Sequence, residues 1–146
     1  MNAFEIRDFI ADCYIPLLSV ALLINLRYLR ATQHIAKFKA GLCLTLLSIV
    51  SVYAVMYIDL KFHIWSSIRL DYSTHTALSM ALIFILLQNG SRYRTALITS
   101  FILYLALMRY QHYHSIMDMV STIAVIGSLL FFAALVRRSV KSSRVV

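Results

Sequence analysis

The sequence predicts an all-α, polytopic transmembrane helix bundle of about five helices. Of its 146 residues, 61% are hydrophobic and only 14% are charged, whereas soluble domains carry about 25% charged residues. The mean hydropathy of +0.78 indicates the same class. Only three Gly and one Pro interrupt the apolar runs. The length suits one compact bundle, so we treat residues 1–146 as a single domain.

Five apolar stretches approach the roughly 20 residues that a transmembrane helix needs. In chain order, the predicted helices cover residues 9–27, 38–58, 73–89, 93–109 and 115–136. The third and fourth are short, and the segment QNGSRYR between them predicts a tight turn. The two stretches could instead be one kinked segment, but residues 73–109 are too many for a single crossing.

The basic residues predict the orientation of this bundle. Ten lie on one side of the membrane and four on the other. The positive-inside rule therefore places the N-terminus outside and the C-terminus in the cytoplasm. The basic clusters lie between apolar runs, where they set topology, so we exclude nucleic acid as a partner despite the net charge of +8. The four outer basic residues are Arg7, Lys61, Arg69 and Arg109.

Acids and histidines gather on the outer side. All six acids lie there in this topology, as do four of the five histidines. Ionisable groups at membrane depth are costly, and by default they indicate function. The outer end of the bundle is therefore the candidate working face. Its histidines are His63, His75, His112 and His114.

The strongest candidate pair is His114 with Asp118. Asp118 lies about one turn inside the fifth predicted helix, and His114 is four residues earlier. Since positions i and i+4 share a helix face, we expect a ring nitrogen of His114 to meet the Asp118 carboxylate. Such a pair fixes the tautomer and stabilises positive charge on the ring, as a nucleophilic histidine requires. The alternative is a pair that only caps the helix.

The segment DYSTHT opens the third predicted helix. Ser73 or Thr74 can cap its N-terminus, where free backbone amides bind anions. His75 lies in the first turn, so its proton can reach a bound anion. An ordinary cap with an interfacial histidine is the alternative.

Three basic residues on the outer side can hold a phosphate. They are Lys61, Arg69 and Arg109, and an arginine can bind phosphate in a bidentate manner. The alternative for each is snorkelling of the side chain to the lipid headgroups. We favour snorkelling for Lys61 and phosphate binding for Arg109.

Two motifs carry a family resemblance. STHTAL resembles the Ser-Gly-His-Thr signature of the type 2 phosphatidic acid phosphatase superfamily. RYQHYHSIMD resembles that superfamily's final motif, an Arg followed by His-x-x-x-Asp at the start of a helix. Asp71, which precedes the first motif, is similar to the acid of the sphingomyelin-synthase-like branch. The resemblance covers about residues 59–135. Thr74 replaces the family glycine, and the family's first motif, a Lys followed by Arg-Pro, has only a loose counterpart in Lys61 and Arg69.

The resemblance implies a mechanism. His114 would attack the phosphorus and form a phosphohistidine, Asp118 would orient His114, and His75 would protonate the departing oxygen. The substrate would be a lipid phosphate or pyrophosphate at the outer interface, with no metal and no cofactor. The groups that hold it would be Arg109, Arg69, Ser73 and Lys61, with Thr74 at the glycine position.

Several functions remain open at the level of sequence. The chain is expected to be a lipid phosphatase, a transferase that passes a phospho-headgroup to another alcohol, or a non-catalytic lipid-binding member. A metal-binding membrane protein is a further alternative, because the outer histidines and acids are possible ligands. We expect a multi-pass protein of the bacterial inner membrane whose site faces the periplasm, with a eukaryotic endomembrane and its lumen as the alternative.

Overall fold

The computed structural model describes the backbone of residues 3–142 and the side chains of residues 11–135. This part of the chain contains helices and no strand, which confirms the predicted all-α class. The helices are α1 (Ala3–Ala31), α2 (Ile35–Phe62), α3 (Ile64–Ser67), α4 (Thr74–Gln88), α5 (Arg94–Tyr110) and α6 (Ile116–Ser142).

Three of the described helices are long and apolar enough to cross a membrane: the segments Ala11–Ala31, Ile35–Phe62 and Ile116–Leu135. They agree with the predicted membrane-protein class. α4 and α5 have 15 and 17 residues, or about 22 and 25 Å, which is less than the roughly 30 Å hydrocarbon core of a bilayer. The structure thus supports three spans by length, where the sequence predicts about five.

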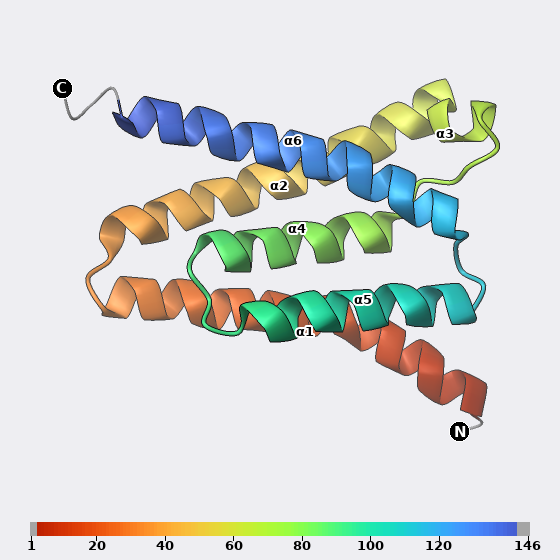
Figure 1. The fold of residues 1–146 in the computed structure, drawn as a ribbon, viewed down its shortest axis with the longest axis horizontal. Helices are drawn as coiled ribbons and strands as arrows, with labels where there is room; N and C mark the ends of the chain where they lie inside the picture. The colour runs from red at the N-terminus through yellow and green to blue at the C-terminus, as the bar shows by residue number, and fades with distance from the viewer. Residues whose placement is uncertain (1–2, 143–146) are drawn as a thin grey trace.

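α4 is the central helix of the bundle (Figure 1). It packs against α1, α2, α5 and α6, and eight of its 15 residues are buried. Ala77, Ser79 and Ala81 are among these buried residues, and such small side chains let neighbouring helices approach closely. The helix that begins with the STHT motif is therefore held in place from several sides.

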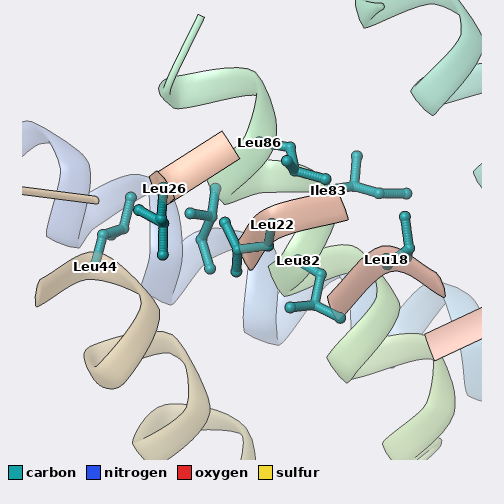
Figure 2. Packing of buried hydrophobic residues seen from close by; sticks show 8 residues of the cluster. Leu18, Leu22, Leu26, Leu44, Leu82, Ile83 and Leu86 are labelled. Carbon is teal, nitrogen blue, oxygen red and sulfur yellow. The ribbon is translucent and has the colours of Figure 1, made fainter. Parts of the chain in front are cut away.

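Leucines at helical spacing join α1 to α4 (Figure 2). One α1 residue per turn points to the same side, because positions four residues apart share a face. These side chains meet apolar residues of α4 and one leucine of α2, and they form a buried cluster. Its labelled members are Leu18, Leu22, Leu26, Leu44, Leu82, Ile83 and Leu86.

The predicted turn between the third and fourth apolar stretches is confirmed. α4 ends in a Schellman motif, in which Ser91 N donates to Leu86 O at 3.2 Å and Gly90 N to Leu87 O at 3.2 Å. Gly90 has φ +84°, a conformation that glycine adopts without a Cβ clash. The turn reverses the chain and makes α5 antiparallel to α4 (Figure 1).

The candidate site residues lie at one end of the bundle. Figure 1 shows that α2 ends, α4 begins, α5 ends and α6 begins at this end, while the α1–α2 and α4–α5 turns lie at the opposite end. The short helix α3 and the loop that follows it connect α2 to α4 here. The segregation of histidines and acids expected from the sequence is thus a feature of the fold.

Candidate functional site

Asp118 is the N-terminal anchor of α6. Its Oδ2 accepts a hydrogen bond from Ser115 N at 2.7 Å, and Asp118 N donates to Ser115 Oγ at 3.1 Å. This reciprocal pair is a capping box, which satisfies two backbone donors at the start of a helix. Asp118 is 8% exposed. Its carboxylate therefore serves the helix cap.

The same carboxylate fastens α6 to the segment that precedes α4. Asp118 Oδ1 accepts from Asp71 N at 2.9 Å, and Thr122 Oγ1 accepts from Ser73 N at 3.1 Å. Asp118 and Thr122 are one turn apart and share a face of α6. The two bonds place the N-terminus of α4 directly beside the N-terminus of α6.

His114 lies outside α6, which corrects the expectation that His114 and Asp118 share a helix face. α6 begins at Ile116 because Ser115 caps it. The Nδ1 atom of His114 lies 3.6 Å from Oδ2 of Asp71, with the two side chains 13% and 74% exposed. The structure thus pairs His114 with Asp71, while both oxygens of Asp118 accept from backbone amides.

This pairing sets the chemistry of His114. At 3.6 Å the Asp71 carboxylate is too far for a hydrogen bond to Nδ1, but its negative charge favours a proton on this nearer ring nitrogen. In the neutral ring the lone pair is then on Nε2, the nitrogen opposite the pair. The Nδ1 atom is buried and has no hydrogen-bond partner among the described residues, and the Asp71 carboxylate lies at ion-pair distance from it.

The residues of the STHT motif differ in burial and in their contacts. Ser73 is the N-cap of α4: its Oγ accepts from Thr76 N at 3.3 Å and donates to Thr76 Oγ1 at 2.8 Å. Ser73 is 0% exposed, and its hydroxyl is used in the cap, which confirms one of the two expected capping candidates. Thr74 is half-buried, with Oγ1 3.7 Å from Met56 Sδ. His75, by contrast, is exposed in the first turn of α4.

A buried layer supports the loop below these motifs. Asp59 Oδ1 accepts from Trp65 N at 2.8 Å, and Trp65 Nε1 donates to Ser121 Oγ at 2.9 Å. Tyr72 Oη donates to Val52 O at 3.1 Å. Burial, with a smaller contribution from the Asp59 carboxylate, raises the pKa of Tyr72, so its phenol remains a donor. These contacts connect α2, α3 and α6 around the start of α4.

Two of the predicted phosphate-binding cations are exposed at this end. Lys61 lies in the last turn of α2, with its Nζ 5.7 Å from the centroid of the Phe62 ring. Arg69 has φ 59° and donates its backbone amide to Ser66 O at 3.1 Å. Both side chains are exposed, one at the end of α2 and the other in the loop that leads to α4.

Arg109 pairs with His112 at the end of α5. Arg109 Nη1 lies 3.3 Å from His112 Nδ1. Because a guanidinium only donates, Nδ1 must accept, and the neutral ring of His112 carries its proton on Nε2. His112 and His114 therefore differ in role: His112 offers an N–H donor, and His114 offers a lone pair.

A groove adjoins this pair between α5 and α6. Its volume is about 680 Å³, and Arg109, Tyr110 and His112 line it beside apolar side chains of both helices. Met119 is 4% exposed and forms part of its floor. The apolar lining residues are Leu105, Ala106, Ile116, Met119, Val120 and Ile123.

Among the residues that the structure describes, no group of three His, Cys, Asp or Glu side chains is placed to hold a metal ion. His114 pairs with a carboxylate, and His112 pairs with a guanidinium. Each of these two rings thus contacts a different partner.

The fold and the site together define a class: an all-helical, membrane-type bundle with a histidine–carboxylate pair at one end. Comparison of the chain with known protein families, with curated proteins and with solved structures finds no match.

Sequence reasoning missed the capping role of Ser115 and the contact between Asp71 and His114. Ser115 was detectable, because Ser-Ile-Met-Asp before an apolar run fits the capping-box pattern. The partnership of Asp71 with His114 joins residues 43 positions apart in a loop, and no local periodicity predicts such a contact.

Proposed function

We propose that this chain is an integral membrane phosphatase that acts on a lipid phosphate or pyrophosphate through a phosphohistidine on His114. The observation that carries the proposal is the His114–Asp71 pair beside two joined helix N-termini. The pair favours a lone pair on His114 Nε2, and helix N-termini favour bound anions. The motifs STHT and HSIMD support the same chemistry through their resemblance to the type 2 phosphatidic acid phosphatases.

The proposed reaction has two steps. His114 Nε2 attacks phosphorus, and the bond from phosphorus to the lipid oxygen breaks as His75 gives that oxygen a proton. His75 then takes a proton from water, which attacks the phosphohistidine and releases phosphate. Arg109, Arg69 and Lys61 offset the charge on the phosphoryl oxygens, which is the main source of rate enhancement in phosphoryl transfer.

The contacts of the two carboxylates support proposed roles that differ from those in the sequence-based mechanism. Asp71 orients His114 and stabilises its positive charge, while Asp118 holds the N-termini of α4 and α6 together. The second role is indirect, because Asp118 positions the segment that carries Asp71.

The proposed topology has five crossings, with the N-terminus outside and the C-terminus in the cytoplasm. The excess of basic residues on the other side of the bundle supports this orientation. α4 and α5 are short, but the fold surrounds α4 with other helices, so that little of it needs to match the bilayer thickness. We place the protein in a bacterial inner membrane with the site facing the periplasm.

The decisive experiment is phosphate release from phosphatidic acid by purified protein in detergent micelles. We expect His114→Ala to lower the turnover number by about 10³-fold or more, because it removes the nucleophile. His34→Ala is the matched control: it makes the same change in an exposed histidine at the opposite end of the bundle, and we expect it to retain full activity.

Labelled substrate identifies the intermediate and the acceptor. With phosphorus-labelled phosphatidic acid, we expect an acid-labile phosphoenzyme in the wild type and none in His114→Ala. A labelled alcohol in the same assay separates hydrolysis from headgroup transfer, since transfer yields a labelled lipid. Unchanged turnover in His114→Ala would refute the mechanism, and absence of phosphate release and transfer by the wild type would favour a non-catalytic lipid-binding role.

A further inference from the structure

We propose that the α5–α6 groove binds an acyl chain of an anionic lipid whose phosphate is held at one end by Arg109 and His112. The proposal deepens the function above and rests on its membrane location. It adds a route by which the lipid is held, and it assigns His112 as a residue that selects for phosphate.

The dimensions of the groove suit a lipid chain. A volume of about 680 Å³ lies within the roughly 300–1,000 Å³ of ligand-binding pockets. Its walls come from the C-terminal half of α5 and the N-terminal half of α6. Ile116 and Val120 are 56% and 53% exposed along one wall. In a bilayer no water is present to cover such surfaces, so a hydrocarbon chain is the matching occupant.

The end of the groove carries positive charge and donors. Arg109 and His112 both line the groove, and their mutual contact leaves the other guanidinium donors and the His112 Nε2–H available. Both side chains are exposed. This set of donors complements the several acceptor oxygens of a phosphate, and a neutral headgroup would leave it without an anion. Charge complementarity therefore selects an anionic lipid over a neutral one.

The backbone conformation at His112 permits a substitution that removes the side chain without disturbing the fold. α5 ends in a Schellman motif in which Tyr113 N donates to Met108 O at 3.2 Å and His112 N to Arg109 O at 3.2 Å. His112 holds the left-handed position of this motif, with φ 58°, where glycine is favoured. His112→Gly thus removes the imidazole and places at this position a residue that the turn favours.

The position of the groove connects it to the reaction site. Residues 111–115 form the α5–α6 connection, which carries His112 at one end and His114 near the other. A lipid seated in the groove has its phosphate on the same short loop as the proposed nucleophile. The groove therefore provides lateral access from the membrane to His114.

The test uses photo-crosslinking with full-length protein in phosphatidylcholine vesicles. The probe is phosphatidic acid with a photoactivatable group in its acyl chain, and crosslinked peptides are identified by mass spectrometry. We expect labels at Ala106, Val120 and Ile123, with about tenfold less labelling for Arg109→Ala, as for loss of a charged hydrogen bond. We expect about threefold less labelling for His112→Gly, with no loss of thermal stability. Ala106→Trp, which fills the groove, should abolish the labels at Val120 and Ile123.

Controls separate a bound lipid from the surrounding bilayer. Ile102→Trp makes a large change on an exposed face of α5 outside the groove, and we expect normal labelling. A diacylglycerol probe should label the groove at most one-tenth as strongly, and free inorganic phosphate should not compete. Equal labelling of the groove and of Ile102 by both probes would show only surrounding lipid and overturn the proposal, as would displacement by inorganic phosphate. His114→Ala should label normally, so a failed phosphatase mechanism leaves this binding result intact.

Discussion

Two histidines two positions apart have opposite chemistry because their Nδ1 atoms face opposite partners. Nδ1 of His112 faces a donor, Arg109, at 3.3 Å, whereas Nδ1 of His114 faces an acceptor, Asp71, at 3.6 Å. A single ring nitrogen cannot satisfy both kinds of partner in one neutral tautomer. Under the proposed mechanism this contrast favours His114 over His112 as the nucleophile, and Asp71→Asn tests the contribution of the carboxylate.

We expect Asp71→Asn to lower the turnover number about 10- to 100-fold. The amide cannot stabilise positive charge on His114, and it can favour the wrong tautomer, as in other His–Asp pairs. The loss should be smaller than for a buried carboxylate, because Asp71 is 74% exposed and solvent screens the interaction. The measurement is phosphate release from phosphatidic acid together with the melting temperature.

The melting temperature distinguishes orientation from folding. Asp71 contributes its backbone amide to Asp118, and the substitution keeps that amide, so the melting temperature should not change. Asp12→Asn is the matched control, since Asp12 is also exposed and lies in α1. Full activity of Asp71→Asn would show that Asp71 does not orient His114. In that case either Asp118 orients the ring or no carboxylate does.

At the scale of the helix, the N-cap of α6 stabilises the fold at the same place where the candidate site lies. Ser115→Ala removes the Oγ that accepts from Asp118 N at 3.1 Å. We expect it to lower the free energy of unfolding by about 1 kcal/mol, the usual cost of losing an N-cap side chain. Thermal unfolding in detergent measures this, with Ser128→Ala as control. Ser128 lies in the same helix and donates only to Ala124 O, so we expect its change to be within about 0.5 kcal/mol. Equal stability of the Ser115 and Ser128 variants would show that the cap is dispensable.

The sequence predicts elements well where local chemistry determines them. Asn89-Gly90 marks the α4–α5 turn because the turn needs a left-handed residue, and Ser73 caps α4 as one of two expected candidates. The expectation that His114 and Asp118 share a helix face is wrong because α6 begins only after Ser115, although the two side chains still interact electrostatically. Asp71 reaches His114 through a loop whose course depends on Trp65, which no periodicity encodes.

At the scale of the whole molecule, hydropathy predicts the class and leaves the number of crossings open. The contacts of Asn89 indicate how far α4 extends along the bundle toward the α1–α2 turn. Asn89 Nδ2 donates to Asn25 Oδ1 at 3.0 Å, and a Cβ on Gly41 would lie 2.9 Å from Asn89 Oδ1. Asn25 is six residues before the end of α1, and Gly41 is six residues after the start of α2. The end of α4 thus lies about 9 Å short of the α1–α2 turn.

Because α4 ends at this depth, the accessibility of the α4–α5 turn distinguishes a topology of five membrane crossings from one of three. With five, Arg92 and Arg94 extend to the cytoplasmic headgroups, and the turn faces the cytoplasm. With three, α4 and α5 would form a re-entrant hairpin that starts and ends on the outer side, with its turn buried among the other helices within the membrane. We therefore predict that Ser91→Cys, in a chain whose Cys13 and Cys43 are replaced by Ser, resists a membrane-impermeant maleimide in intact bacterial cells and reacts after permeabilisation. His63→Cys in the same background is the control and should react in intact cells. Reaction of Ser91→Cys in intact cells would contradict the five-crossing topology, and resistance of Ser91→Cys even after permeabilisation would favour three crossings with a re-entrant hairpin.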